Sequence, residues 1–330
     1  MGYTIIEKIM AGHANPKVDQ IKPGDIVWID LDVRSARDFG GANVVDRFEK
    51  EFGLDARVDD PARTFFTFDC VVPAKTIPYA DNQHRCRGFA RKQNLKVFDV
   101  NQGIGSHVMI ENGLAQPGST VVGTDSHLNI MGAVGAFGQG MGDQDITFAF
   151  QNGRTWFEVP KTIKVTLKGT PSSQALAKDI TLAVLGQLGS SHALGKALEF
   201  YGEAVDNLSP AGRITLASMA TEMGAIIALI PPNQQIIETC LASTEQAVYA
   251  DHDALYCEEI EISIDGLESM VSLPGAPHKT VPLKQVAGKK IDSVFVGSCT
   301  NGRLEDFQAV YQILKDNQIA ENVIINLVPA

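Results

Sequence analysis

Residues 119–127 read STVVGTDSH, an apolar run that changes to polar side chains within a few residues. The first half predicts a short buried strand, because β-branched residues favour strands. Thr124, Asp125, Ser126 and His127 then follow at the point where that strand would end. In open α/β sheets the ligand crevice lies at the carboxyl ends of the strands. The stretch therefore predicts an α/β fold and also the edge at which a site would lie.

Three other stretches repeat this pattern. TFFTF leads into Asp69 and Cys70, LKVFDV leads into a turn that ends in His107, and DSVFVG leads into Cys299 and Asn301. Any one of these polar residues could simply cap a helix, as Asp, Ser and Asn often do. Four such strand ends in one chain favour a shared site.

Strands and helices alternate along the rest of the chain, which predicts α/β layers. Strands are predicted at 26–32, 64–68, 95–100, 119–123, 161–168, 258–264, 292–297 and 322–328. Helices are predicted at 43–52, 84–94, 105–113, 143–156, 174–188, 213–228, 234–247 and 303–317. The segment 161–168 alternates apolar with charged residues and should have one wet face. The segment 292–297 is more continuously apolar, as in a buried parallel sheet.

The chain has 330 residues, more than one ordinary core holds, so we expect several domains. Composition changes little along the sequence, and weak signals place boundaries near 156 and 285. The expected units are 1–156, 157–284 and 285–330. The last contains only two predicted strands and is expected to be incomplete.

The overall composition excludes some functions. The net charge of −11 argues against a nucleic-acid partner, which would need a basic patch. The sequence contains no run of about 18 apolar residues, so it predicts no membrane span. The five cysteines show no close pairing, and a reducing cytoplasm is the simplest interpretation.

The polar residues at the strand ends suggest acid–base chemistry. Asp125 could orient His127 for proton transfer, and His107 is a second candidate acid or base. Cys299 precedes a predicted helix, where backbone N–H groups would lower its thiol pKa. It could equally be a small buried residue in a tight turn. The glycine-rich run at 132–142 lacks the Gly-Lys-Ser/Thr ending of a phosphate loop, so we reject nucleotide binding there.

Four motifs together resemble the aconitase superfamily, and most closely the large subunits of 3-isopropylmalate isomerase (dehydratase) and homoaconitase. They are GIGSH at 103–107, GTDSH at 123–127, KALEFYG at 196–202 and VGSCTNGRLEDF at 296–307. The likeness covers essentially the whole chain in order. It implies α/β/α layers with a cluster crevice at the strand ends. It also implies a hydro-lyase that dehydrates and rehydrates a hydroxy di- or tricarboxylic acid through an enoic acid, as in leucine biosynthesis.

The resemblance also implies roles for particular residues. Cys299 matches one ligand of a [4Fe–4S] cluster whose open iron acts as a Lewis acid. Candidate catalytic residues, matched one by one to family motifs, are Asp69, His107, Asp125, His127 and Glu199. Candidate substrate-binding residues are Ser126, Asn301 and Arg303.

The sequence also departs from the family pattern. No Cys-x-x-Cys pair follows Cys299 within the 330 residues, so the cluster ligand set is expected to be incomplete. Cys70 stands where the family has a histidine; it could face the pocket, act as a metal-facing thiolate, or point into the core. Arg37 and Asp38 begin a stretch that replaces a His-Asp-Gly-Thr turn.

The family's final, swivelling domain implies a separate small subunit as partner, beside the hydroxy-acid substrate. Two hypotheses follow from the sequence. The first is the cytoplasmic hydro-lyase large subunit. The second is a catalytically incomplete relative that serves as a scaffold or binds a partner.

Overall fold

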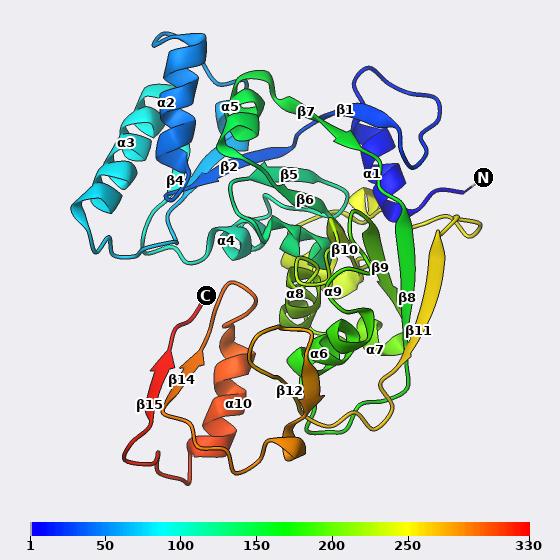
Figure 1. Ribbon diagram of the computed structural model, residues 1–330. Coiled ribbons are helices and arrows are strands. Elements are labelled where there is room, and N and C mark those ends of the chain that lie inside the picture. Colours follow the sequence, from blue (N-terminus) through cyan, green and yellow to red (C-terminus); the bar gives the residue numbers. More distant parts are fainter. Residues whose placement is uncertain (1) are drawn as a thin grey trace.

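The computed structural model describes residues 2–330 and confirms the α/β fold class. Three parallel sheets dominate it: one of five strands, one of four and one of two. In Figure 1 the five-stranded sheet lies at the top left and the four-stranded sheet at the right. The two-stranded sheet lies at the lower left.

The five-stranded sheet has the order β4-β3-β2-β5-β6, and all its neighbours are parallel. Its strands are β2 (Val33–Arg37), β3 (Thr64–Thr67), β4 (Lys96–Phe98), β5 (Thr120–Gly123) and β6 (Phe137–Gly140). Helices α2 (Gly41–Phe52), α3 (Ile77–Gln93), α4 (Gly105–Glu111) and α5 (Asp143–Asn152) connect and cover them. In β3 the neighbours Phe65 and Phe66 are both buried but belong to different apolar clusters, because successive side chains face opposite sides of a sheet.

The four-stranded parallel sheet has the order β10-β9-β8-β11. Its strands are β8 (Thr162–Lys168), β9 (Ala197–Tyr201), β10 (Ile227–Leu229) and β11 (Glu258–Ser263). Its helices are α6 (Ala177–Leu188), α7 (Glu203–Asp206), α8 (Pro210–Ser218) and α9 (Gln234–Thr239). In β8 the apolar side chains are buried and the lysines are half-buried or exposed, which confirms the predicted wet face.

Smaller elements complete the two larger units. Helix α1 (Ile5–His13) begins with a capping box formed by Thr4 and Glu7. Strands β1 (Ile26–Asp30) and β7 (Arg154–Glu158) form an antiparallel ribbon. Strands β12 (Met270–Ser272) and β13 (Thr280–Pro282) form another.

The two larger units share their cores. One apolar cluster combines Phe66 with Ile227, and another combines Val33 with Ile214. The 3-10 segment η2 (Leu128–Val134) is fully buried and lies against β10. There the Ile230 N–H donates to the carbonyl of Gly132 at 2.9 Å, and a Cβ on Gly132 would lie 1.9 Å from the Ala228 carbonyl oxygen. Because these contacts cross the expected boundary near 156, the division into three domains stays a proposal.

The third unit has little core. Strands β14 (Ser293–Val296) and β15 (Ile324–Leu327) pair in parallel, and α10 (Leu304–Leu314) joins them. The prediction that 292–297 is a buried strand is wrong: Ser293 and Phe295 are exposed, and Phe295 is 62% accessible. A strand's composition does not reveal whether anything covers it. Among the described residues, no member of the three apolar clusters comes from this unit.

Other boundaries also differ from the prediction. The helix expected at 143–156 ends at Asn152, because Gly153 takes a positive φ of 66° and caps it. Residues 154–158 are then a strand. The helix expected at 213–228 ends at Ser218, and 227–229 is β10. Strands β2, β6, β7, β9 and β10, together with the β12–β13 ribbon, were not predicted.

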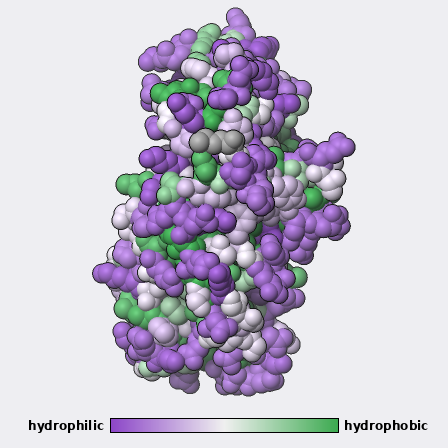
Figure 2. Space-filling model, turned by 90° about the vertical axis from the view of Figure 1, so that its right-hand side faces the viewer, coloured by the Kyte–Doolittle hydropathy of each residue, from purple (hydrophilic) through white to green (hydrophobic). Residues whose placement is uncertain are grey.

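The surface mixes polar and apolar residues. On the face shown in Figure 2, hydrophilic residues predominate and hydrophobic ones gather in separate patches. Such mixing is ordinary for a folded protein in water. Among the described residues, none of the helices has the length and apolarity needed to cross a bilayer.

Candidate active site

Arg37 joins two of the predicted strand-end carboxylates. It is the last residue of β2, and β2 lies between β3 and β5, so Asp69 and Asp125 emerge on either side of it. Its Nε donates to Asp69 Oδ1 at 2.7 Å and its Nη1 donates to Asp125 Oδ1 at 3.1 Å. Burial alone would lower the pKa of Arg37, but the two carboxylates outweigh burial and raise it. The sequence did not predict Arg37 as a site residue, because VRSAR does not look like a buried strand.

Asp69 also fixes the start of α4. Its Oδ2 accepts the N–H of Gly105 at 2.7 Å, and its side chain is only 2% exposed. Burial raises the pKa of Asp69, and Arg37 opposes that shift. Position 105 must be glycine, because a Cβ there would lie 2.4 Å from Thr67 Oγ1. The GIGSH motif is thus held against the end of β3.

Cys70 lies beside Asp69, half-buried, with its Sγ 3.5 Å from Asp69 Oδ1. Burial raises the pKa of Cys70 to about 12, so it is a thiol at neutral pH. Asp38, Asp69 and Cys70 are close enough together to hold a metal ion. However, Asp38 accepts from the N–H groups of Asp69 and Cys70 and from Gln83. These contacts give Asp38 a structural role, and we assign no metal site there.

His127 has a different partner from the one expected. Asp125 Oδ1 accepts the backbone N–H of His127 at 3.0 Å, not its ring. The ring Nε2 lies 3.3 Å from Glu222 Oε1, and Nδ1 lies 3.2 Å from Ser126 Oγ. The hydrogen bond with Glu222 raises the pKa of His127. The expectation that Asp125 orients the imidazole is therefore corrected: Glu222 does so.

Glu222 was not predicted from the sequence. It follows α8 in a turn without a strand-end pattern, and only the fold brings it to His127. Burial would raise its pKa, but the hydrogen bond with His127 outweighs burial and lowers it. Its second oxygen, Oε2, is buried and has no partner among the described residues. The carboxylate therefore keeps an acceptor free.

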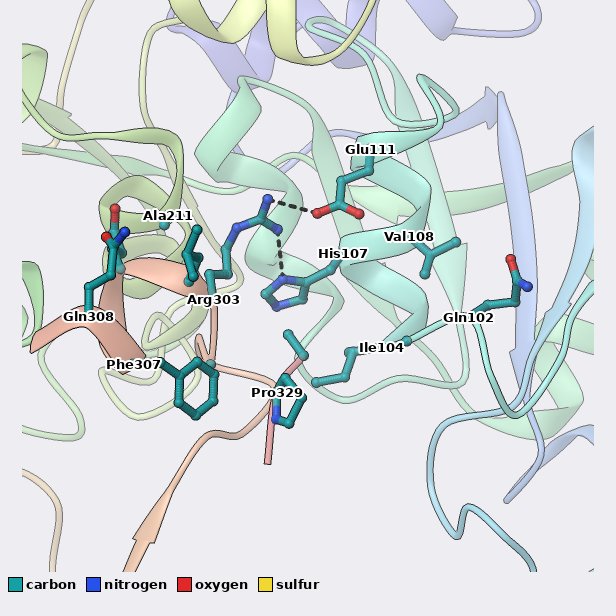
Figure 3. A pocket seen from close by; sticks show the side chains of 15 residues that line it. Gln102, Ile104, His107, Val108, Glu111, Ala211, Arg303, Phe307, Gln308 and Pro329 are labelled. Atoms are coloured by element: carbon teal, nitrogen blue, oxygen red, sulfur yellow. Dashed lines mark hydrogen bonds and ion pairs between the residues drawn. The ribbon is translucent and has the colours of Figure 1, made fainter. Parts of the chain in front are cut away.

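His107 is buried and connects α4 to the third unit. Its Nε2 lies 3.0 Å from the carbonyl oxygen of Cys299, so Nε2 carries the proton. The bare Nδ1 then accepts from Arg303 Nη1 at 3.2 Å. Burial lowers the pKa of His107, in keeping with a neutral ring. Figure 3 shows Arg303 between His107 and Glu111, whose carboxylate it meets at 2.7 Å. These three residues line a pocket of about 610 Å³.

The loop after β14 carries Cys299 and Asn301. Gly297 has a φ of +123°, and a Cβ there would lie 1.7 Å from the Val328 carbonyl oxygen, so only glycine fits. Asn301 is buried and donates to Thr215 Oγ1 at 2.7 Å and to the Ala211 carbonyl at 3.3 Å. The loop is thereby attached to α8.

Cys299 is half-buried, and burial raises its thiol pKa, with the charge of Asp125 acting in the same direction and that of Arg37 opposing it. The expectation of a lowered pKa is corrected, because burial outweighs the effect of the loop. Because the charges of Asp125 and Arg37 act on its thiol, Cys299 belongs with the cluster of Arg37, Asp69 and Asp125.

Glu199 is not brought to this group. It lies on β9, fully buried, and its Oε1 accepts the N–H of Ile5 at 2.7 Å. Its Oε2 accepts from the hydroxyls of Tyr201 and Tyr256. Burial raises its pKa. The geometry gives Glu199 a structural role at the N-terminus of α1, in place of the expected catalytic one.

The structure thus brings together Asp69, Asp125, Ser126 and His127 on one side and Cys299, Asn301 and Arg303 on the other, with His107 between them. The arrangement offers a permanent cation, paired carboxylates and an imidazole with raised pKa. It can bind an anion and transfer a proton.

Comparison with known proteins identifies similar sequences. The model of the aconitase family (aconitate hydratase) matches residues 7–330. The "3-isopropylmalate dehydratase large subunit 1" of Methanopyrus kandleri is 37% identical over this whole chain and 79% of its own length. The "probable methanogen homoaconitase large subunit" of Methanosarcina mazei is 38% identical over 90% of this chain and 76% of its own. A solved structure, the holo form of Thermococcus kodakaraensis aconitase X, matches 94% of this chain at 13% identity and a TM-score of 0.49, from which we draw nothing.

Proposed function

The chain belongs to the aconitase family, and from that premise we propose that it is the large subunit of a hydro-lyase. The reaction would be the reversible dehydration and rehydration of a hydroxy di- or tricarboxylic acid such as 3-isopropylmalate. The names of its relatives support this substrate class. The observation that carries the proposal is the group of Arg37, Asp69, Asp125 and His127 at the strand ends.

His127 is our candidate acid and base. Removing a hydroxyl requires a proton donor, because hydroxide is a poor leaving group. The pKa of His127 is raised, chiefly by Glu222, so more of it is protonated near neutral pH than of an ordinary histidine. The imidazolium would donate Nε2–H to Glu222 and Nδ1–H to Ser126 Oγ. Ser126 is exposed and can pass a proton to a ligand.

The other residues position the site. Both ring nitrogens of His107 are engaged, so we give it the task of holding Cys299 and Arg303 rather than moving a proton. Arg37 bridges Asp69 and Asp125 and so fixes the spacing of the two carboxylates. Asn301 ties the Cys299 loop to α8.

The family points to an iron–sulfur enzyme. The charges of Asp125 and Arg37 act on the Cys299 thiol, and Cys299 is our candidate for one cluster ligand. A four-iron cluster needs several thiolates. Among the described residues Cys86 and Cys240 are buried in apolar clusters, Cys257 lies elsewhere on the surface, and Cys70 is tied to Asp69. The described residues therefore do not hold the cluster alone, and we derive no step through it.

The relatives are called large subunits, which implies a small-subunit partner for them. We propose a comparable partner here, and a cytoplasmic location. The swivelling domain that such a subunit carries would supply carboxylate-binding residues of the crevice.

The test is turnover by the native enzyme, purified with any bound partner. We expect it to convert 3-isopropylmalate, or a close hydroxy acid such as homocitrate, with the enoic acid as intermediate. His127→Asn should lower kcat by roughly 10²- to 10⁴-fold, the usual contribution of a general acid or base. His84→Asn, at an exposed histidine on α3, is the matched control. The proposal fails if wild-type enzyme neither binds nor converts any hydroxy di- or tricarboxylic acid offered.

A further inference from the structure

Lys178 has no carboxylate partner, although it lies near the crevice. It is the second residue of α6, and its Nζ lies 3.2 Å from Met219 Sδ. Among the described residues, no carboxylate oxygen lies within the 4.0 Å of an ion pair with it. A thioether sulfur is only a weak acceptor, whereas an ammonium group carries three N–H donors. Most of its hydrogen-bonding capacity is therefore available to a ligand.

The contact with Met219 connects Lys178 to the candidate active site, because Met219 begins the turn that carries Glu222. Burial lowers the pKa of its ammonium group, while Glu222, Asp306 and Cys299 act to raise it. Glu222 is the partner of the His127 ring, and the carbonyl of Cys299 accepts from His107. Lys178 thus lies beside the turn whose Glu222 holds the His127 ring.

Nothing in the helix explains a lysine at this position. The N-terminal end of a helix carries partial positive charge and disfavours a cation in the first turn. The adjacent Asp179 does not compensate, because its carboxylate accepts the N–H groups of Leu176 and Met270. The residue gains neither a salt bridge nor a favourable helix dipole by being there.

The other two cations of the site are already engaged. Arg37 is held by Asp69 and Asp125, and Arg303 is held by Glu111 and His107. Lys178 also remains accessible to solvent, as a residue that meets a ligand must be. It is the cation of this group that no described carboxylate holds.

We propose that the ammonium group of Lys178 binds one carboxylate of the hydroxy acid and so selects di- and tricarboxylates over monocarboxylates. This inference rests on the proposed function. Lys178 is a substrate-binding residue, with no part in the proton transfer that we assign to His127. Its loss should weaken binding much more than it slows the chemical step.

The experiment combines variants of Lys178 with altered ligands. The native enzyme is titrated by calorimetry with 3-isopropylmalate and with each of its two monoamides, which replace one carboxylate by a neutral amide. Lys178→Met should weaken binding of the dicarboxylate at least about tenfold and raise KM similarly, with kcat changed less than about threefold. For one of the two monoamides the variant and the wild type should bind equally. Lys178→Arg should recover most of the affinity.

The controls separate the possible failures. Lys284→Met removes an exposed lysine that pairs with Glu268 and should leave binding unchanged. Thermal unfolding is followed for every variant, and Lys178→Gln replaces Lys178→Met if the latter does not fold. If the neutral variants bind 3-isopropylmalate as wild type does, the Lys178 inference is wrong while the proposed function stands. If wild type binds no hydroxy acid, the proposed function itself is wrong.

Discussion

Strands β5 and β14 both end in a polar turn that reaches the site, but their surroundings differ. All four residues of β5 are buried, because β2 and β6 flank it and helices cover it. Strand β14 pairs only with β15, and Phe295 in its middle is exposed. The same strand–turn pattern is therefore built once inside a core and once outside it.

The third unit is held to the rest mainly by polar contacts. Asn301 bonds to α8, the carbonyl of Cys299 bonds to His107, and Arg303 pairs with Glu111. Each such contact adds only about 1 kcal/mol, or somewhat more when charged, whereas a buried aromatic side chain adds several times as much. The side of the site that carries Asp69, Asp125 and His127, the packed wall, is thus fixed by packing. The side that carries Cys299, Asn301 and Arg303, the polar wall, is fixed by a few hydrogen bonds.

The sharpest test of this difference is to truncate one phenylalanine in each sheet. Phe66 on β3 is fully buried and packs edge-on against Phe89 and Phe150. Phe66→Ala should lower the free energy of unfolding by about 3–5 kcal/mol. Phe295→Ala should change it by less than about 0.5 kcal/mol. Urea unfolding measures both, and comparable losses would mean that β14 is packed after all.

The second prediction concerns the packed wall. Arg37→Met leaves Asp69 and Asp125 without their cation. We expect the free energy of unfolding to fall by about 2–4 kcal/mol, which is less than for a fully buried ion pair because Arg37 is partly exposed. Without Arg37 the pKa of Asp69, already raised by burial, should rise further. A raised carboxyl pKa costs stability above the pKa of the unfolded state, so the deficit should shrink as pH falls from 8 toward 4.

Urea unfolding at several pH values measures this deficit. Arg63→Met, at a half-exposed arginine that pairs with Asp32 and Asp60, should cost no more than about 1 kcal/mol at any pH. A deficit in Arg37→Met that is independent of pH would contradict the assignment to stranded carboxylates.

The third prediction concerns the polar wall. Asn301→Ala removes the donor to Thr215 Oγ1 and one of the donors to the Ala211 carbonyl, which still accepts from Thr215 Oγ1. The change should cost about 1–3 kcal/mol, mostly in local attachment. Amide hydrogen exchange across 290–330 should accelerate while β2 and β5 stay protected. Asn317→Ala removes an exposed asparagine of the same unit and should change little. Uniform acceleration throughout the chain would argue against a separately attached unit.

The smallest effect is expected at the His127–Glu222 pair. Glu222→Gln removes the main cause of the raised His127 pKa, which should fall toward its ordinary value of 6.5. His127 stabilises the fold below its unfolded pKa and loses that contribution as pH rises through its raised pKa. Glu222 stabilises it above its own ordinary value of 4.5 and loses that contribution as pH falls through its lowered pKa.

The pair therefore contributes most between about pH 4.5 and 6.5, and by at most about 1 kcal/mol. Histidine NMR titration of wild type and variant reads the pKa directly. An unchanged His127 pKa would exclude Glu222 as its cause.

The sequence predicted the strands that are rich in β-branched and aromatic residues, such as β3 and β5, together with the polar residues that follow them. It missed β2, because the buried Arg34 makes the strand look like a turn; the fold accommodates this arginine by pairing it with Asp59. It also missed Arg37 at the end of that strand.

The sequence also does not reveal which side chains that are distant along the chain contact each other. Glu222 has no local signal, since only packing of α8 against η2 brings it to His127. Glu199 was expected at the site because of its motif, but the neighbours that hold it come from α1 and from the segment before β11. A motif fixes which residue types occur, and tertiary contacts decide what they touch.

The backbone contact between Gly132 and Ile230 has a consequence for motion. With no room even for a Cβ at Gly132, and with cores that run across the junction, the two larger sheets cannot slide or hinge against each other without breaking buried packing. We therefore expect them to move as one rigid body. The freedom to open the crevice then belongs to the third unit, whose few polar contacts can break and re-form in turn. Entry and release of a ligand would be governed by how often that unit swings away, carrying Cys299 and Arg303 with it.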